Sequence, residues 1–157
     1  MGETGVGARG AGVTCTNGGS VVSVIGADEA IVVCTPEVSA VRDVDRVIGL
    51  LGNRFKPQLI INRLRPHLVR RGKLLSVDDV NGILRLPLLG VIADEPEIIV
   101  TTNRGEPLAL QTHTATGAAY HAIAARVAGE DVPAPMPPAA KPSFAERLSA
   151  FFGGKRR

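Results

Sequence analysis

The stretch Leu59-Ile60-Ile61-Asn62-Arg63-Leu64-Arg65-Pro66 decides the fold of this 157-residue chain. Its leading branched aliphatic residues suit a strand that is buried on both faces, as in a parallel sheet flanked by helices. Asn62 ends the aliphatic run with an amide that can both donate and accept hydrogen bonds. A polar group at the carboxyl end of a buried strand lies where open α/β sheets bind ligands. The alternative, from this stretch alone, is an ordinary strand followed by a basic loop.

Two further aliphatic runs, at 30–34 and 87–92, predict buried strands before and after that stretch. Strands that alternate with helices at this spacing indicate an α/β fold with a doubly wound parallel sheet. Only these three strands are expected, so the sheet is partial and one of its long edges has no partner in the chain. An unpaired edge exposes backbone hydrogen-bonding groups. We therefore expect part of the sheet's natural surroundings to be absent.

Helices are predicted between and after these strands. Thr35-Pro36-Glu37 is typical of a helix start, and the apolar residues that follow it recur at helical spacing up to Gly52. Residues 76–79 read Ser-Val-Asp-Asp, a capping-box pattern that opens a second helix. A short helix is expected over 97–102, and a longer one over about 112–128.

Composition narrows the function classes. The formal charge is +3, but the basic residues do not form one patch with interleaved aromatic residues, so nucleic acid is not expected as a partner. There is no Trp and a single Tyr, which predicts an aliphatic core. Two cysteines form no disulfide framework and favour a reducing, intracellular compartment. No apolar run reaches the ~18–20 residues of a membrane span, and a secretory signal pattern is lacking.

The first 25 residues are expected to be a disordered or unrelated leader, because glycine crowds them. The run at 2–9 is superficially similar to a phosphate-binding loop. Such a loop follows a strand and needs a Lys for the phosphates and a Ser or Thr for magnesium. Ala8 and Arg9 stand at those positions here, so we expect no phosphate site in the leader.

The C-terminus has a different pattern. Residues 131–142 are rich in proline and alanine and predict an extended linker. In 143–157 one helical face is apolar, and basic residues that include Lys155 and Arg156 surround it; the apolar positions are Phe144, Leu148, Phe151 and Phe152. This pattern is typical of an amphipathic helix in an anionic membrane interface, bound weakly by one copy and better by two joined copies. The alternative is a helix that docks on its own domain.

Several segments, in order from residue 26 to the end, resemble the MinD family of bacterial and plastid cell-division regulators. The matching runs are 35–43, 45–51, 62–66, 71–80 and 102–107, together with the amphipathic tail. The resemblance identifies 26–130 as the C-terminal part of a P-loop NTPase-like domain. It implies a deviant P-loop ATPase that uses ATP and Mg2+, forms a homodimer, binds the inner face of the cell membrane (or lies in the plastid stroma and at its inner envelope), and acts with MinC and MinE to place the division septum.

The resemblance also assigns residue roles. Asn62, Arg63 and Ala93 would lie at the nucleotide, with Asn62 bonded to the adenine edge. Asp43 and Asp45 would lie on the partner-binding helix. The tail residues named above would enter the lipid.

The departures from the family set a limit on these roles. Ala93 replaces the family's adenine-flanking proline, and the family's phosphate loop, switch segments and magnesium ligands have no match here. We therefore expect a fragment or truncated gene product that alone neither binds ATP tightly nor hydrolyses it. The alternatives are a non-enzymatic membrane-binding interaction module and a related ATPase of plasmid partition or flagellar placement.

Overall fold

The computed structural model describes residues 11–14 and 29–138. Four parallel strands form one sheet in the order β1-β2-β3-β4. Their bounds are Ala11–Thr14, Ala30–Cys34, Gln58–Leu64 and Leu88–Ala93. The helices are α1 (Val38–Leu51), α2 (Pro66–Arg70), α3 (Val77–Leu84), α4 (Pro96–Asn103) and α5 (Ala115–Val127), with short 3-10 turns at Gly52–Arg54 and Leu108–Leu110.

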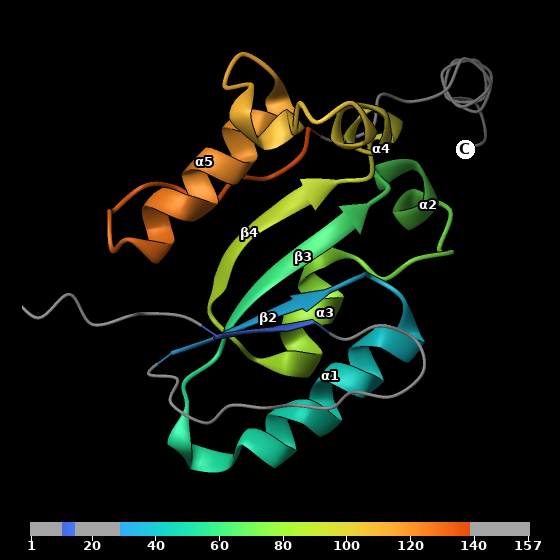
Figure 1. Cartoon of the computed structure of the whole chain (residues 1–157). Coiled ribbons are helices and arrows are strands. Elements are labelled where there is room, and N and C mark those ends of the chain that lie inside the picture. Colours follow the sequence, from blue (N-terminus) through green and yellow to red (C-terminus); the bar gives the residue numbers. More distant parts are fainter. Residues whose placement is uncertain (1–10, 15–28, 139–157) are drawn as a thin grey trace, which may run out of the picture.

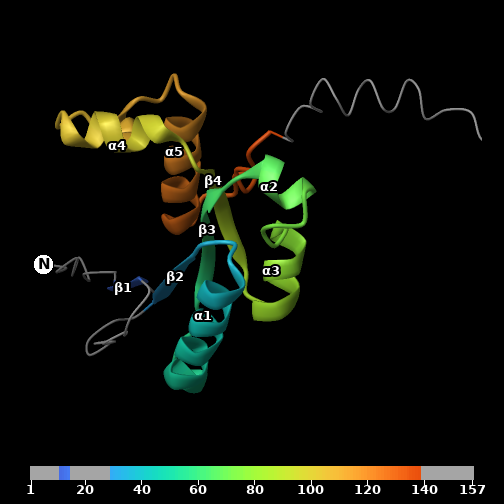
Figure 2. The same ribbon diagram turned by 90° about the vertical axis from the view of Figure 1, so that its right-hand side faces the viewer.

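Helices lie on both faces of the sheet, as Figures 1 and 2 show. One face packs against α1 and α3, where the aliphatic side chains of β2 and β3 meet Val44 and Val80, both fully buried. The other face packs against α5 through Leu89, Ile92 and Ile123. Leu59 and Ile61 of β3 are fully buried on the α1/α3 face, and Ile60, half-buried, packs on the α5 face, so the central strand is covered on both faces as predicted.

β1 is a difference from the sequence expectation, because it falls within the leader for which no regular structure was predicted. Its register pairs Ala11 with Ala30 and Thr14 with Val33, in parallel with β2. The segment Ala-Gly-Val-Thr is too short and too rich in small residues to show a strand pattern of its own. It forms a ladder through its backbone, on an edge of β2 that would otherwise be open.

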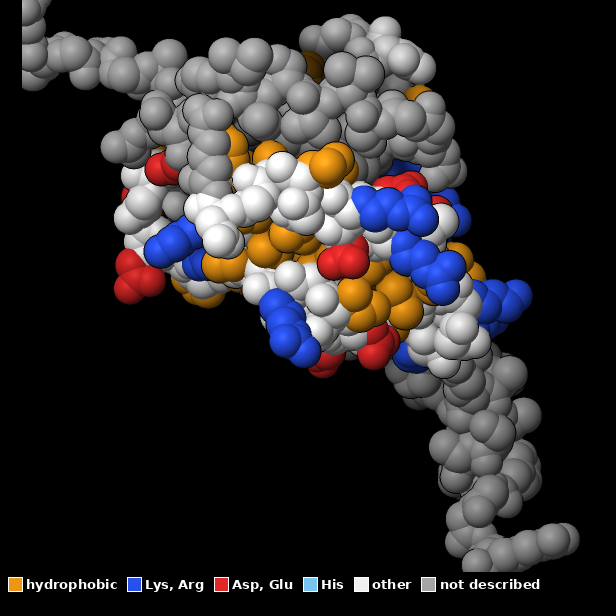
Figure 3. Space-filling model, turned by 90° about the horizontal axis from the view of Figure 1, so that it is seen from below, with side chains coloured by type: hydrophobic (Ala, Val, Ile, Leu, Met, Phe, Trp, Pro, Cys, Tyr) orange, Lys and Arg blue, Asp and Glu red, His pale blue; other side chains and the backbone are white. Residues whose placement is uncertain are grey.

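α1 begins later than its start signal predicts. Glu37 is the N-cap residue and makes no side-chain capping bond, so Thr35 does not cap the helix. Pro36 is instead buried, and its carbonyl oxygen accepts a hydrogen bond from the Leu75 amide at 3.0 Å. The helix ends as predicted at Gly52, whose φ of 57° lies in the left-handed region. On the face of the molecule shown in Figure 3, exposed hydrophobic side chains (orange) lie between Lys or Arg (blue) and Asp or Glu (red) side chains.

The capping box at the start of α3 is confirmed. The Asp79 amide donates to Ser76 Oγ at 3.0 Å, and the Ser76 amide donates back to Asp79 Oδ2 at 2.9 Å. The Ser76 hydroxyl also donates to Asp79 Oδ2 at 2.7 Å. Hydrogen bonds from the Ser76 side chain and backbone lower the pKa of the Asp79 carboxyl from its ordinary 3.8.

Replacing Ser76 with alanine is expected to cost about 1 kcal/mol of unfolding free energy, because one N-cap bond is lost. A carboxyl with a depressed folded-state pKa stabilises the fold above its unfolded pKa, and that contribution disappears as the pH falls through the lower value. The difference between the variant and the unaltered chain should therefore shrink below about pH 3.8. Urea unfolding at neutral and acidic pH measures it, with Ser39→Ala on α1 as the control. A constant difference across this range would contradict the link to Asp79.

The segment 132–138, called the strap below, lies along the outer edge of β4. Pro135 accepts a hydrogen bond from the Val91 amide at 2.9 Å. The Arg126 guanidinium donates to the carbonyl oxygen of Val132 and, at 3.2 Å, to that of Leu88. This docking differs from the free extended linker expected for 131–142. It also pairs part of the outer edge of β4, the strand at the other end of the sheet from β1.

Candidate functional site at the carboxyl edge of the sheet

The ladder between β3 and β4 is interrupted where the aliphatic run ends. Ile61 pairs with Val91 and Leu64 pairs with Ala93, so Asn62 and Arg63 lie in an irregularity between two paired positions. Arg63 has a φ of 59°, an uncommon value for a residue with a side chain. Such strained positions cluster at functional sites, where the surrounding structure holds them in place.

Asn62 is half-buried at this irregularity. Its side-chain oxygen accepts a hydrogen bond from the Arg63 amide at 2.9 Å. The two N–H donors of the amide are left for another acceptor among the groups that reach this edge. An amide in this place can recognise a planar group that offers both donors and acceptors.

Asp94 holds the irregularity in its shape. Arg63 Nε donates to Asp94 Oδ1 at 3.3 Å, and Arg65 Nε donates to Asp94 Oδ2. The Asp94 amide bonds the Leu64 carbonyl oxygen at 2.9 Å. Burial favours a higher pKa for this carboxyl, but hydrogen bonds from the two arginines and their positive charges outweigh it and hold the pKa below 3.8. Asp94 is therefore ionised at neutral pH and fixes both arginines at the carboxyl edge.

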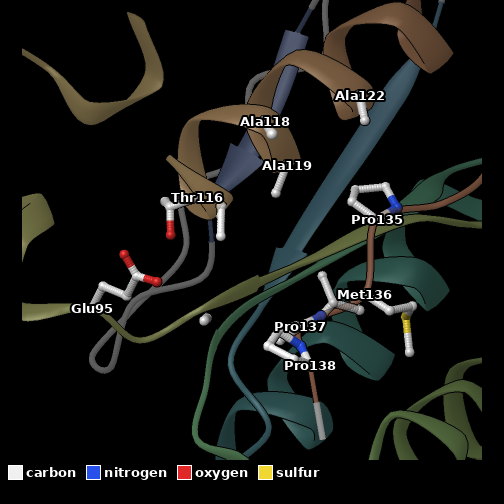
Figure 4. A pocket seen from close by; sticks show the side chains of 12 residues that line it. Glu95, Thr116, Ala118, Ala119, Ala122, Pro135, Met136, Pro137 and Pro138 are labelled. Atoms are coloured by element: carbon white, nitrogen blue, oxygen red, sulfur yellow. The ribbon is translucent and has the colours of Figure 1, made fainter. Parts of the chain in front are cut away.

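Ala93 is one of the residues that line a cavity of about 290 Å³ between β4, α5 and the strap, which Figure 4 shows. Most of its lining is apolar and comes from small side chains such as Ala119 and Ala122 and from strap prolines. Its polar side chains are Glu95 and Thr116, both labelled in Figure 4. The pairing of β3 with β4 brings residues 62 and 63 to the same edge of the sheet as residue 93.

The partner-helix prediction concerns a different surface. Asp43 is half-buried on α1 and forms an ion pair with Arg46 at 3.2 Å, whereas Asp45 is exposed. The buried face of the helix carries Val41, Val44, Val47 and Leu51, whereas Val38, counted from its spacing as part of the predicted apolar stripe, is exposed. An isolated exposed pair contributes little stability, which leaves these charges available for recognition.

The predicted membrane residues Phe144, Leu148, Phe151, Phe152, Lys155 and Arg156 lie outside the described residues. Within the described residues, none of the helices has the length and apolar character that crossing a membrane requires. The same part of the chain contains no group of three or more His, Cys, Asp or Glu side chains that could hold a metal ion.

The described residues offer different groups to the base of a nucleotide and to its phosphates. The half-buried amide of Asn62 offers N–H donors to the edge of a planar base. By contrast, the described ranges contain no glycine-rich turn with a following lysine to hold phosphates.

Sequence reasoning missed three features of this site: Asp94, Glu95 and the strap. Asp94 could have been found, because it is the first charged residue after the third predicted strand, at the edge already marked by Asn62. The strap had no such signal, since four prolines within 132–138 are typical of a free linker.

Comparison with known proteins identifies the relatives of this chain. No family model matches it. The septum site-determining protein MinD of Bacillus subtilis is 42% identical to it over 134 residues, which cover 83% of this chain and 50% of that protein. The chain is related to the C-terminal portion of MinD. It therefore spans about half the length of the curated relatives that it matches.

Solved structures agree with this assignment. The MinC:MinD cell-division complex of Aquifex aeolicus contains a chain 42% identical to this one, with a TM-score of 0.67, over 70% of this chain and 46% of that one. The MinD of Pyrococcus horikoshii, solved with Mg-ADP, is 26% identical with a TM-score of 0.54, over 66% of this chain and 42% of that one. The predicted α/β fold, a partial P-loop NTPase-like sheet, is confirmed.

Proposed function

We propose that the chain is the C-terminal part of a MinD-like regulator that places the division septum. The observation that carries the proposal is the 42% identity to a MinD across 83% of the chain. The carboxyl edge of the sheet supports it, because its polar and strained residues gather where an α/β sheet binds its ligand. In domain terms, 26–130 belongs to the NTPase-like unit and 143–157 is the membrane helix.

In this proposal the chain contributes the part of the nucleotide site that contacts the base. The Asn62 amide bonds the edge of adenine, Asp94 and the two arginines keep the irregularity in shape, and Ala93 lines the face of the ring less closely than a proline would. One relative was solved with Mg-ADP, which supports a nucleotide with magnesium as the ligand. The phosphates and the magnesium ion require groups outside the described residues. The chain alone is therefore a weak ATP binder without turnover.

Its partners follow from the same family. A related chain was solved in complex with MinC, and α1 offers Asp43 and Asp45 on its outer side. We assign MinC, and through the same helix MinE, to this surface. A homodimer completes the assembly, since two tails bind a membrane much more strongly than one. The cellular place is the inner face of the cell membrane or the equivalent plastid envelope.

Reversing both acidic charges on α1 tests the MinC assignment. We expect Asp43→Lys with Asp45→Lys to weaken binding to MinC of the same organism at least about tenfold, because the partner would meet like charge. Calorimetry of the full chain with purified MinC measures the affinity. Glu106→Lys, an exposed acid outside α1, is the matched control and should bind as the unaltered chain does. Absence of MinC binding by the unaltered chain would contradict the assignment.

A non-enzymatic membrane module remains the second candidate, since the predicted tail helix and α1 need no catalysis. The two candidates differ in their need for nucleotide. Membrane binding that is indifferent to ATP, even after the N-terminal half of a MinD is supplied, would favour the module.

A further inference from the structure

The end of the strap fixes the place on the domain from which the predicted tail starts. Pro137 and Pro138 line a cavity of about 210 Å³ together with Leu64 of β3, Val69 of α2 and Val77 of α3. The described chain therefore ends beside α2, and Figure 2 shows its last residues, in red, near that helix. The predicted tail starts from this point, at the carboxyl edge of the sheet.

The turn after α2 is strongly basic. Residues 70–73 contain Arg70, Arg71 and Lys73 and no acid, whereas the arginines at 63 and 65 precede α2 and pair with Asp94. Arg71 and Lys73 are exposed, and the turn that carries them folds back on α2 through bonds from the Gly72 amide to Val69 and from the Lys73 amide to Leu68, both at 2.9 Å. Val69 also lines the cavity of about 210 Å³ that contains Pro137 and Pro138. The basic turn is therefore held close to the point where the predicted tail begins.

The distance from that root to the predicted tail helix is short. Only residues 139–142 separate Pro138 from Ser143, and five extended peptide units span at most about 18 Å. A tail helix that lies in the interface therefore holds the α2 end of the domain near the lipid headgroups. Charges interact across about 8–10 Å of physiological salt solution, so a basic turn at this position is attracted to anionic lipid.

We propose that Arg71 and Lys73 form a second membrane contact, which binds anionic headgroups while the tail enters the lipid. This inference rests on the membrane role in the proposed function and adds the orientation of the domain. The carboxyl edge of the sheet then faces the membrane, and the amino-terminal ends of the strands face away from it.

Neutralising the turn tests the inference. Arg71→Gln with Lys73→Gln in the full chain should weaken binding to vesicles of phosphatidylcholine and phosphatidylglycerol about 30-fold, because each basic residue near an anionic surface contributes about fivefold. High salt should erase the difference between this variant and the unaltered chain. The matched control is Lys56→Gln with Arg85→Gln, the same charge change before β3 and β4 at the opposite end of the sheet, with no expected effect.

Circular dichroism and the Tm identify variants that fold normally, and these are the ones compared. Equal vesicle binding by both double variants would overturn the inference while leaving the tail's role intact. Failure of the unaltered chain to bind vesicles at all would refute the membrane part of the proposed function as well. An added single-stranded RNA that displaces the unaltered chain from vesicles through the same two residues would also overturn it, in favour of a nucleic-acid surface.

Discussion

Gly117→Ala is expected to destabilise the domain more than a Gly→Ala substitution at any other described glycine. A Cβ atom at Gly117 would lie 2.0 Å from the Gln111 carbonyl oxygen and 2.8 Å from that of Leu108. Both obstacles are backbone atoms, so the first turn of α5 must move away from the preceding 3-10 turn. The first turn of α5 is also held by its N-cap residue, Thr114, whose Oγ accepts a hydrogen bond from the Gly117 amide at 2.9 Å.

Overpacking of this kind costs about 3 kcal/mol, the upper end of the usual range. The Tm should then fall by roughly 10 °C or more, for a domain of this size. Gly82→Ala on α3 is the matched control, because a Cβ atom there meets nothing within 4 Å. It should stabilise the chain by up to about 1 kcal/mol through helix propensity. Equal Tm values for the two variants would show that α5 is not seated as described.

Removing the tail is the change with the largest expected effect on function. A chain that ends at Pro142 should lose at least about 100-fold in binding to anionic vesicles, because each buried Phe or Leu contributes roughly 1.5–3 kcal/mol before the cost of ordering the peptide. Co-sedimentation of the full and shortened chains measures this loss.

Two point variants separate the apolar face from the mere presence of a tail. Leu148→Asp places a charge on the predicted apolar face, and Ala150→Asp places the same charge on the opposite side of the helix. Only the first should reduce vesicle binding strongly. Equal sedimentation by the full chain and the chain ending at Pro142 would refute the membrane tail.

The sequence predicted the centre of this fold better than its borders. β2, β3 and β4 carry aliphatic runs that only a strand covered on both faces accommodates. The location of Asn62 and Ala93 at one edge of the sheet could be predicted, since carboxyl ends of parallel strands share an edge. The capping box of α3 was legible because its two partners are three residues apart.

Features that depend on distant contacts could not be predicted. The irregularity at Arg63 is held by Asp94, a residue 31 positions away. Thr35 failed as a cap because Pro36 is committed to a contact with Leu75. The strap docks because Gly90 leaves the space that Pro135 and Ile123 occupy, at 2.7 Å from where a Cβ atom would lie, and no local pattern reports such a space.

The bond from the Val91 amide to Pro135 gives the molecule a natural reporter. Within the described chain this amide is paired to the strap and not to another strand, so its deuterium uptake measures how often the strap lifts from β4. Neighbouring core amides that bond within the sheet supply the reference rate. A single peptide from exchange mass spectrometry would therefore reveal whether vesicles, MinC or nucleotide alter the way the tail is anchored.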